Sequence, residues 1–511
     1  MKSPELDTEQ YRQECRATAV NIQHQEDERF ISATFLKWAL SILLAYFGAR
    51  LVFFALNIAA FVPPDEVTHA GICKIFSKSF LLPDNSPDTY EFGLVTNIPW
   101  LYYWTMGKLL HLNFFGVSDL VFLRLLNIPL AFGTVWYAVR LLRLLTTNRL
   151  TLLLLVVVMT NTPMFSFLSA SVSSDNLTNL LAAMAFYYLF AFFRERSTSL
   201  LVASLLCQLA GCLTKITFLP LVLALNVLLL ILGFRYLITL PAAIMHYCRT
   251  SVQRTLLSIV LLLITTGLNL HLYAGNYLLY GGLNLEMKDV LSNQAAMQNR
   301  TNARGLIFKQ YKEGRISYMD ALILTGEIKH PGDKADTFYL LMNFQQLKHN
   351  PALWLGPIDY AKVWARIMLS TIFGIKGHLQ IYKGAVAMMA IYAVIGLTCL
   401  GFVMRWRPRK DGWLPPTLMT VAIMYTGYLM YYFNYGSYKT YGEPSLTVYG
   451  RYLFPVMTPV YVVMCYYFLY LFRSGYGRWM LALATAVFFI SYDFPWFLLN
   501  TTPEWYQWMP R

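Results

Sequence analysis

Long apolar runs are the feature of this chain that most limits its fold. A helix needs about 20 predominantly apolar residues to cross the hydrocarbon core of a bilayer, and runs of that order recur along most of the sequence. Charged residues make up only 13% of the chain, against about 25% in a typical soluble domain. The sequence therefore predicts an all-α polytopic membrane protein and an integral, multi-pass location.

About eleven transmembrane helices are expected, one for each apolar run. The runs cover residues 38–62, 120–142, 150–168, 177–193, 200–213, 216–232, 256–273, 385–404, 414–432, 452–472 and 479–499. The fifth run is short, so it is either a tilted span or part of a broken helix.

The spacing of the runs divides the chain into five parts. They are a segment 1–37, seven spans within 38–274, a long segment 275–383, four spans within 384–500 and a tail 501–511. A second long segment, 62–120, follows the first span. Its apolar stretch from Asn97 is shorter than a span, which predicts a helix lying at the membrane surface.

The cations are distributed unequally between the two sides of the predicted bundle. Fourteen Lys and Arg residues lie in or beside the short turns on one side, including the "RWRPRK" turn that begins at Arg405. The short turns opposite hold three, Lys215, Lys439 and Arg451. Because positive turns stay in the cytoplasm, we expect a cytoplasmic N-terminus, an extracytoplasmic C-terminus and both long segments outside.

The net charge of +14 comes largely from cations that lie beside the apolar runs. Most cations flank apolar runs, where they set topology and contact lipid headgroups. Membrane lipids are therefore expected partners, and nucleic acid is not. The seven cysteines lack metal-ligand spacing. Gly-rich phosphate loops and HExxH are also absent from the sequence, which excludes ATP-driven transport and zinc proteolysis of the HExxH type.

The stretch "PPDEVTH" opens the first long segment, where the chain leaves the first span. Asp65 and His69 are four positions apart and Glu66 is three before His69, so a helix would place them on one face. A carboxylate at this boundary can act as a general base toward a sugar or lipid hydroxyl. The alternative is a helix N-cap with a surface ion pair.

A second acid and several cations are expected at the same membrane depth. Asp175 lies in the outer turn "SVSSDN", either beside Asp65 or as the N-cap of the next helix. Arg124, Lys215 and Arg451 lie near outer helix ends, where they can bind an anion such as a lipid phosphate or merely reach the headgroups. Arg50, midway along the first span, needs a partner or a wet cavity.

The segment "STIFGIKGHLQIYKG", residues 370–384, precedes the eighth span. Its glycines predict an irregular backbone packed closely against a neighbour. Lys376 and Lys383 add two further candidate phosphate ligands. We interpret His378 as structural.

The order of these motifs resembles the GT-C superfamily of polyprenyl-phosphate-sugar glycosyltransferases. The resemblance runs from the first span through "PDE", "NIPWLYYW", "RLLNIPLAFGTVW" and "ASVSSDNLTN" to "GRYLFP". The chain is more closely similar to a group of bacterial polytopic membrane proteins that share Pro-Asp-Glu-x-x-His and Gly-Arg-Tyr-x-x-Pro motifs. In the aminoarabinose transferase branch a Lys precedes paired prolines, where this chain has Asn97, Ile98 and Pro99.

The resemblance implies a glycosyltransferase of a bacterial inner membrane, acting on the extracytoplasmic side. Its donor would be a polyprenyl-phosphate-linked sugar, and its acceptor a glycan, a lipid or a protein. Asp65 would be the catalytic base with Glu66 beside it, Asp175 a supporting acid and Arg451 a phosphate ligand. No cofactor is required, although a divalent metal ion at Asp65 and Glu66 is left open. The alternatives are a lipid or polysaccharide transporter and a non-enzymatic scaffold.

Overall fold

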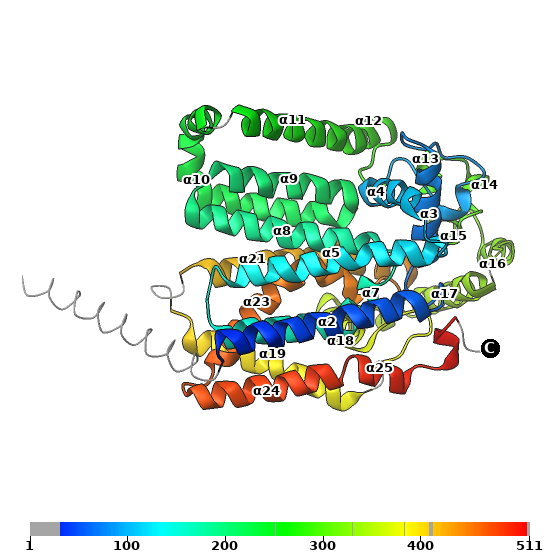
Figure 1. Ribbon diagram of the computed structural model, residues 1–511. Coiled ribbons are helices and arrows are strands. Elements are labelled where there is room, and N and C mark those ends of the chain that lie inside the picture. The colour runs from blue at the N-terminus through cyan, green and yellow to red at the C-terminus, as the bar shows by residue number, and fades with distance from the viewer. Residues whose placement is uncertain (1–30, 251, 330, 383, 408–411, 508–511) are drawn as a thin grey trace, which may run out of the picture.

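The computed structural model describes residues 31–250, 252–329, 331–382, 384–407 and 412–507. Lys383 and most of the segment 1–37 lie outside these residues. Within them the chain is helical, with two isolated β-bridges and no strand (Figure 1). The predicted all-α membrane fold is confirmed.

Seven helical stretches are long and apolar enough to cross a membrane, and a bent pair makes an eighth. The main helices of the bundle are α2 (Ala33–Asn57), α5 (Asp119–Leu142), α6 (Arg149–Thr160), α7 (Pro163–Ser169), α8 (Ser174–Glu195), α9 (Thr198–Thr214), α10 (Leu219–Thr250), α11 (Val252–Asn269), α19 (Ala385–Arg405), α21 (Leu414–Gly427), α23 (Phe454–Tyr470), α24 (Gly475–Ser491) and α25 (Phe494–Asn500). Each of the eleven predicted runs falls on one of these helices or on a consecutive pair.

The bend between α6 and α7 is 66° and has a local cause. Pro163 starts α7, and Thr162 before it is extended, as residues before proline usually are. The break leaves the Thr160 carbonyl for other donors, and it accepts from Arg50 at 2.9 Å and from Ser166 at 2.7 Å. Arg50 also forms an ion pair with Asp493, so the cation in the first span has a buried partner.

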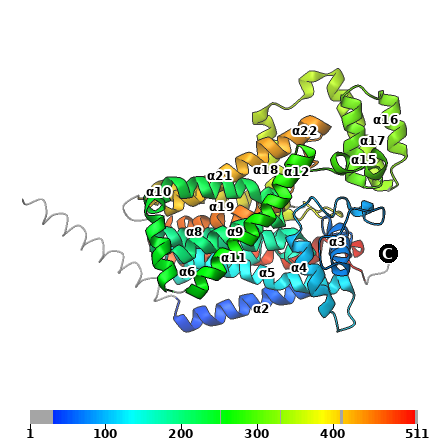
Figure 2. The same cartoon turned by 90° about the horizontal axis from the view of Figure 1, so that it is seen from above.

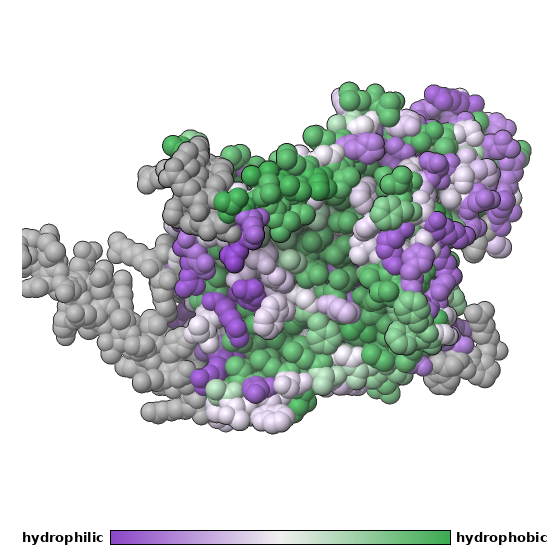
Figure 3. Space-filling view, turned by 45° about the horizontal axis from the view of Figure 1, so that its top comes forward, coloured by the Kyte–Doolittle hydropathy of each residue, from purple (hydrophilic) through white to green (hydrophobic). Residues whose placement is uncertain are grey.

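Burial separates the centre of the bundle from its edge. In their most apolar windows α8 is 67% buried and the stretch Gly450–Tyr470, which includes α23, is 72% buried. For α19 the share is 17%, and for the stretch Val252–Tyr280, which includes α11, it is 11%. Helices whose apolar side chains stay exposed in this way are expected to face lipid. The space-filling view shows apolar residues over most of the bundle and polar residues toward both ends, with the larger polar surface over one of them (Figure 3).

That polar end is built by the two long segments, which meet there (Figures 1 and 2). The first contributes α3 (Glu66–Lys78), η1 (Tyr90–Phe92), α4 (Leu101–Leu109) and η2 (Leu110–Leu112). The second contributes α12 (Gly275–Tyr280), α13 (Met287–Val290), α14 (Asn293–Ala296), α15 (Arg300–Lys312), α16 (Tyr318–Gly326), α17 (Pro331–His349), η5 (Pro351–Leu353) and α18 (Pro357–Gly374). With nine residues, α4 is too short to span a bilayer.

The second segment has two parts with different surroundings. Helices α15, α16 and α17 enclose their own apolar core around Ile307, Phe308 and Leu341. In contrast α18 packs against α7 of the bundle and against η7 (Gly450–Leu453). The segment 275–383 is therefore a small helical unit followed by a helix that joins it to the bundle.

Candidate functional site

Asp65 lies in the turn between the first span and α3. Its backbone is left-handed, with φ 58° and ψ 10°, and its side chain makes no cap hydrogen bond although it is the N-cap residue. Instead its Oδ2 accepts from Nη2 of Arg451 at 2.5 Å. Arg451 also donates to the Pro64 carbonyl at 3.1 Å. One guanidinium therefore fixes both the turn and the carboxylate.

Asp175 is the second acid of this arrangement. Ser173, not Asp175, is the N-cap of α8. The Asp175 Oδ1 pairs with Nζ of Lys215, and its Oδ2 lies 3.7 Å from Nε of Arg451. We call Asp65, Asp175, Lys215 and Arg451 the charge cluster.

The charge cluster joins four segments that are distant in sequence. Arg451 and Asp65 are 386 positions apart, and Lys215 and Asp175 are 40 apart. Its two carboxylates balance its two cations, as buried charges require. The Asp65 side chain is 40% exposed, whereas that of Arg451 is 3% and that of Asp175 is 3% exposed. Asp65 is thus the acid of the cluster with access to a ligand.

Two tyrosines cover the cations of the cluster. The Arg451 guanidinium lies 5.3 Å from the ring centre of Tyr449 and 5.2 Å from that of Tyr452. Lys215 Nζ is 4.9 Å from the Tyr452 ring centre, and Lys376 Nζ is 5.2 Å from that of Tyr449. Cation–π contacts of this kind hold positive charge in place while leaving hydrogen-bond donors for an anion. Burial lowers the pKa of Lys376.

His69 contacts Tyr103 of α4. Its Nδ1 lies 2.8 Å from the Tyr103 hydroxyl, and the two rings stack. Burial lowers the pKa of His69 to about 4, although Asp65 and Asp175 oppose the shift. The imidazole is therefore neutral at pH 7, and it supports the cluster from one side without adding charge.

Glu66 and Arg124 are placed where neither predicted role fits. The Arg124 guanidinium binds both oxygens of Glu66, at 2.8 and 2.5 Å. The backbone N–H of Val172 donates to the same carboxylate at 2.9 Å. Both side chains are fully buried. Arg124 also donates to the carbonyls of Ala55 and Ile58 at the end of α2, so the pair ties α2, α3 and α5 together.

This placement corrects two assignments made from the sequence. Glu66 cannot reach a substrate, because Arg124 and Val172 occupy its oxygens inside the protein. Arg124 cannot bind a donor phosphate, because its donors are already used there. A divalent metal ion at Asp65 and Glu66 stays a prediction, and each of these carboxylates faces a guanidinium in the structure. Among the described residues no group of three metal-ligating side chains is found.

The glycine-rich segment after α18 packs against the backbone that precedes the Asp65 turn. His378 donates its backbone N–H to the Val62 carbonyl at 3.0 Å, and its Nδ1 lies 2.5 Å from the Phe61 carbonyl. A Cβ on Gly377 would lie 2.5 Å from the Val62 oxygen. The predicted close packing at this glycine is present, and His378 contacts backbone.

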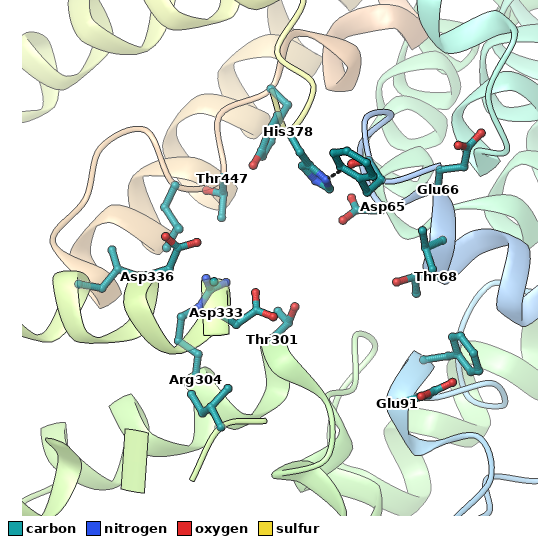
Figure 4. A pocket seen from close by; sticks show the side chains of 18 of the residues that line it. Asp65, Glu66, Thr68, Glu91, Thr301, Arg304, Asp333, Asp336, His378 and Thr447 are labelled. Carbon is teal, nitrogen blue, oxygen red and sulfur yellow. Dashed lines mark hydrogen bonds between the residues drawn. The ribbon is translucent and has the colours of Figure 1, made fainter. Parts of the chain in front are cut away.

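A cavity of about 1710 Å³ opens beside Asp65, between the first long segment and the unit formed by α15, α16 and α17. Asp65, Thr68 and Glu91 line one part, and Arg304, Asp333 and Asp336 line another (Figure 4). Lys376, Tyr449 and Tyr452 connect the cavity wall to the charge cluster. The cavity exceeds the usual 300–1,000 Å³ of pockets for small ligands.

Some residues of this site were not singled out from the sequence. Tyr449 and Tyr452 flank Arg451 within "TVYGRYLFP", so the motif itself carried a signal. The acids of α17 carried none, because an i, i+3 pair of aspartates is ordinary on an exposed helix. Tyr103 is far from His69 in sequence, and only the packing of α3 on α4 brings them together.

No protein-family model matches the sequence, and no curated protein is significantly similar to it. Among solved structures the chain is similar to ArnT from Cupriavidus metallidurans bound to undecaprenyl phosphate, at 13% identity and a TM-score of 0.35, covering 93% of this chain and 82% of that one. It is also similar to the apo state of that ArnT, at 14% identity and a TM-score of 0.35, covering 86% and 78%. At this TM-score the likeness by itself assigns no activity.

Proposed function

We propose that this protein is a membrane glycosyltransferase that moves a sugar from a polyprenyl-phosphate donor to an acceptor hydroxyl at the polar end of the helix bundle. The observation that carries the proposal is Asp65. Its side chain is 40% exposed beside a large cavity, next to the buried Arg451 guanidinium and the pair formed by Lys215 and the buried Asp175. The order of sequence motifs supports the same reaction class.

The cluster can supply what an inverting transfer needs. Asp65 accepts the proton of the acceptor hydroxyl while that oxygen bonds to the anomeric carbon. The bond from the anomeric carbon to the phosphate oxygen breaks, and its electron pair leaves with the polyprenyl phosphate. Because the leaving group is already anionic, cations stabilise it and a general acid is not needed.

The cations divide this work according to their exposure. Arg451 is 3% exposed and bound to Asp65 and Pro64, so we assign it to holding the base and to raising the local positive potential. Lys215 is 19% exposed and Lys376 lines the cavity. We assign these two lysines to contact with the donor phosphate. Lys383 was predicted for the same role and stays a prediction.

The reaction can be tested without knowing the sugar. In Asp65→Asn the side chain keeps its shape and an oxygen for Arg451, but it cannot accept a proton. Native mass spectrometry of the purified variant should therefore show a bound polyprenyl phosphate that still carries its sugar, while the wild type carries the discharged lipid. The mass difference would identify the sugar.

A matched control is Asp359→Asn, which removes an exposed acid that pairs with Lys362 on α18. It should retain the same lipid as the wild type. If all three proteins carry ordinary phospholipids only, the glycosyltransferase proposal is wrong and a transporter of another lipid becomes the better explanation. If Asp65→Asn turns over like the wild type, Asp65 is not the base.

A further inference from the structure

The composition of the cavity beside Asp65 restricts the acceptor, given the proposed function. Six of its lining residues are acids that are exposed or partly exposed: Asp65, Asp88, Glu91, Asp333, Asp336 and Glu443. Glu66 also borders the cavity, but its carboxylate is sealed against Arg124. Three lining residues are cations, namely Arg304, Lys329 and Lys376. Among the described residues, the lining therefore carries a net negative charge.

Three of the acids are not used by the protein itself. Within the described part of the chain, the carboxylates of Asp88, Glu91 and Asp336 have no ion pair and accept no side-chain hydrogen bond. They come from η1, the loop before it and α17, so two segments far apart in the sequence present them to one space (Figure 4). An ionised carboxylate only accepts hydrogen bonds, and it can take two donors at once.

Aromatic rings and hydroxyls lie among these carboxylates. Phe61 is 37% exposed, Tyr339 is 56% exposed and Phe433 is 36% exposed at the same cavity. Thr68, Thr301, Ser445 and Thr447 also line it. Rings of this kind offer flat apolar faces to the C–H surface of a sugar, while carboxylates and hydroxyls meet its O–H groups.

We propose that this cavity is the acceptor site and that it takes a neutral or amine-bearing glycan. The unpartnered carboxylates would accept hydrogen bonds from sugar hydroxyls or ammonium groups, and the exposed rings would stack on sugar faces. A phosphate-bearing or sulfate-bearing acceptor would meet an excess of negative charge and be disfavoured. The inference rests on the proposed function, because it assumes that Asp65 deprotonates a hydroxyl presented from this side.

The arrangement separates the two substrates by charge. The lysines assigned to the donor phosphate, Lys215 and Lys376, contact the rings of Tyr452 and Tyr449. The unused acids line the cavity from η1, the loop before it and α17. Asp65 is in contact with both regions, since it pairs with Arg451 and also lines the cavity. It therefore stands where an acceptor hydroxyl and the anomeric carbon of the donor would have to meet.

The test is binding of soluble tetrasaccharides to the full-length protein in lipid nanodiscs, followed by saturation-transfer NMR. The probes are chitotetraose, its fully deacetylated amine-bearing form, a sulfated heparin tetrasaccharide and, as a non-sugar cation, tetralysine. We expect both chito-oligosaccharides to bind and the sulfated sugar not to. In Glu91→Gln with Asp336→Asn, binding of the amine-bearing sugar should weaken about tenfold, which corresponds to about 1.4 kcal/mol.

Glu327→Gln is the matched control, since Glu327 is an exposed acid beside α16 that does not line this cavity. It should bind like the wild type. Preferential binding of the sulfated sugar, binding of tetralysine without either chito-oligosaccharide, or no binding of any probe would overturn the inference. Retention of polyprenyl phosphate by the same preparation distinguishes that failure from a failure of the proposed function.

Discussion

Asp65 and Glu66 are neighbours in sequence and occupy opposite environments. Asp65 is the left-handed N-cap residue and Glu66 is the first residue of α3, and one carboxylate lines the cavity while the other is buried against the bundle. Asp65 keeps 40% of its side chain exposed against Arg451, while Glu66 is sealed against Arg124. Substitutions at the two positions should therefore affect different properties.

Glu66→Gln is expected to cost stability rather than chemistry. It leaves the Arg124 guanidinium buried without its counter-charge, which typically destabilises a protein by about 3–5 kcal/mol. Thermal unfolding in detergent should show a clear loss, and a double-mutant cycle with Arg124→Met should show strong coupling. Asp359→Asn, which removes an exposed acid of α18, is the matched comparison and should melt close to the wild type. A Glu66→Gln protein of normal stability that retains the sugar-loaded lipid would show that Glu66 takes part in catalysis.

His69 gives a pH dependence whose sign follows from its burial. Its pKa is about 4 in the folded protein and about 6.5 when exposed in the unfolded chain. The unfolded state therefore binds the proton first, and stability present above pH 6.5 is lost as the pH falls through 4. Between pH 7.5 and 4.5 the wild type should lose about 2 kcal/mol more than His69→Gln. Equal losses in unfolding experiments at the two pH values would contradict a neutral, buried imidazole.

At the scale of elements, the Asp65 turn depends on the segment that follows α18. Gly377 packs against the Val62 carbonyl, and His378 binds the carbonyls of Phe61 and Val62. These contacts hold the end of the first span, where Pro63 and Pro64 already restrict the backbone. The glycine-rich segment is therefore part of the support of the candidate base.

Gly377→Ala is expected to disturb that support. The added Cβ would lie 2.5 Å from a backbone oxygen, which has no flexible end that can move aside. Overpacking of this kind costs about 1–3 kcal/mol. Gly326→Ala in α16 is the control, because its Cβ meets nothing within 4 Å. Thermal unfolding should separate the two variants, and indistinguishable melting temperatures would argue against the observed contact.

At the scale of the whole molecule, the two long segments share one end of the bundle, and the cation-rich turns lie at the other (Figure 1). Arg405 at the end of α19 donates to the Leu471 carbonyl after α23, so these turns are packed together. The arrangement agrees with a single orientation across the membrane. Which end is cytoplasmic stays a prediction of the positive-inside rule.

That orientation can be checked by labelling single cysteines in an otherwise cysteine-free protein. Glu327→Cys lies at the polar end and should react with a membrane-impermeant maleimide in intact cells. Ser199→Cys, at the start of α9, lies at the opposite end and should react only after the cells are opened. The reverse pattern would invert the topology and place the Asp65 cavity in the cytoplasm.

Much of this architecture follows from the sequence by itself. Apolar runs of span length fix the helices, because a backbone in hydrocarbon must satisfy its hydrogen bonds within the segment. The acids Asp65 and Asp175 and the cations Arg124, Lys215 and Arg451 were also predicted to lie at one membrane depth, and the structure brings all of them except Arg124 into the charge cluster. Both inferences need only local composition and the order of spans.

Only the tertiary structure decided how the charges pair. Arg50 pairs with Asp493, and Glu66 is buried against Arg124. Of the two acids in the charge cluster, Asp65 is the one whose carboxylate stays exposed. These partners are separated by tens to hundreds of residues, and ion pairing depends on distance and burial rather than on residue type. The position of the α17 acids at the cavity is likewise set by tertiary packing. Their role depends on how a separately packed unit sits over Asp65, which no local pattern records.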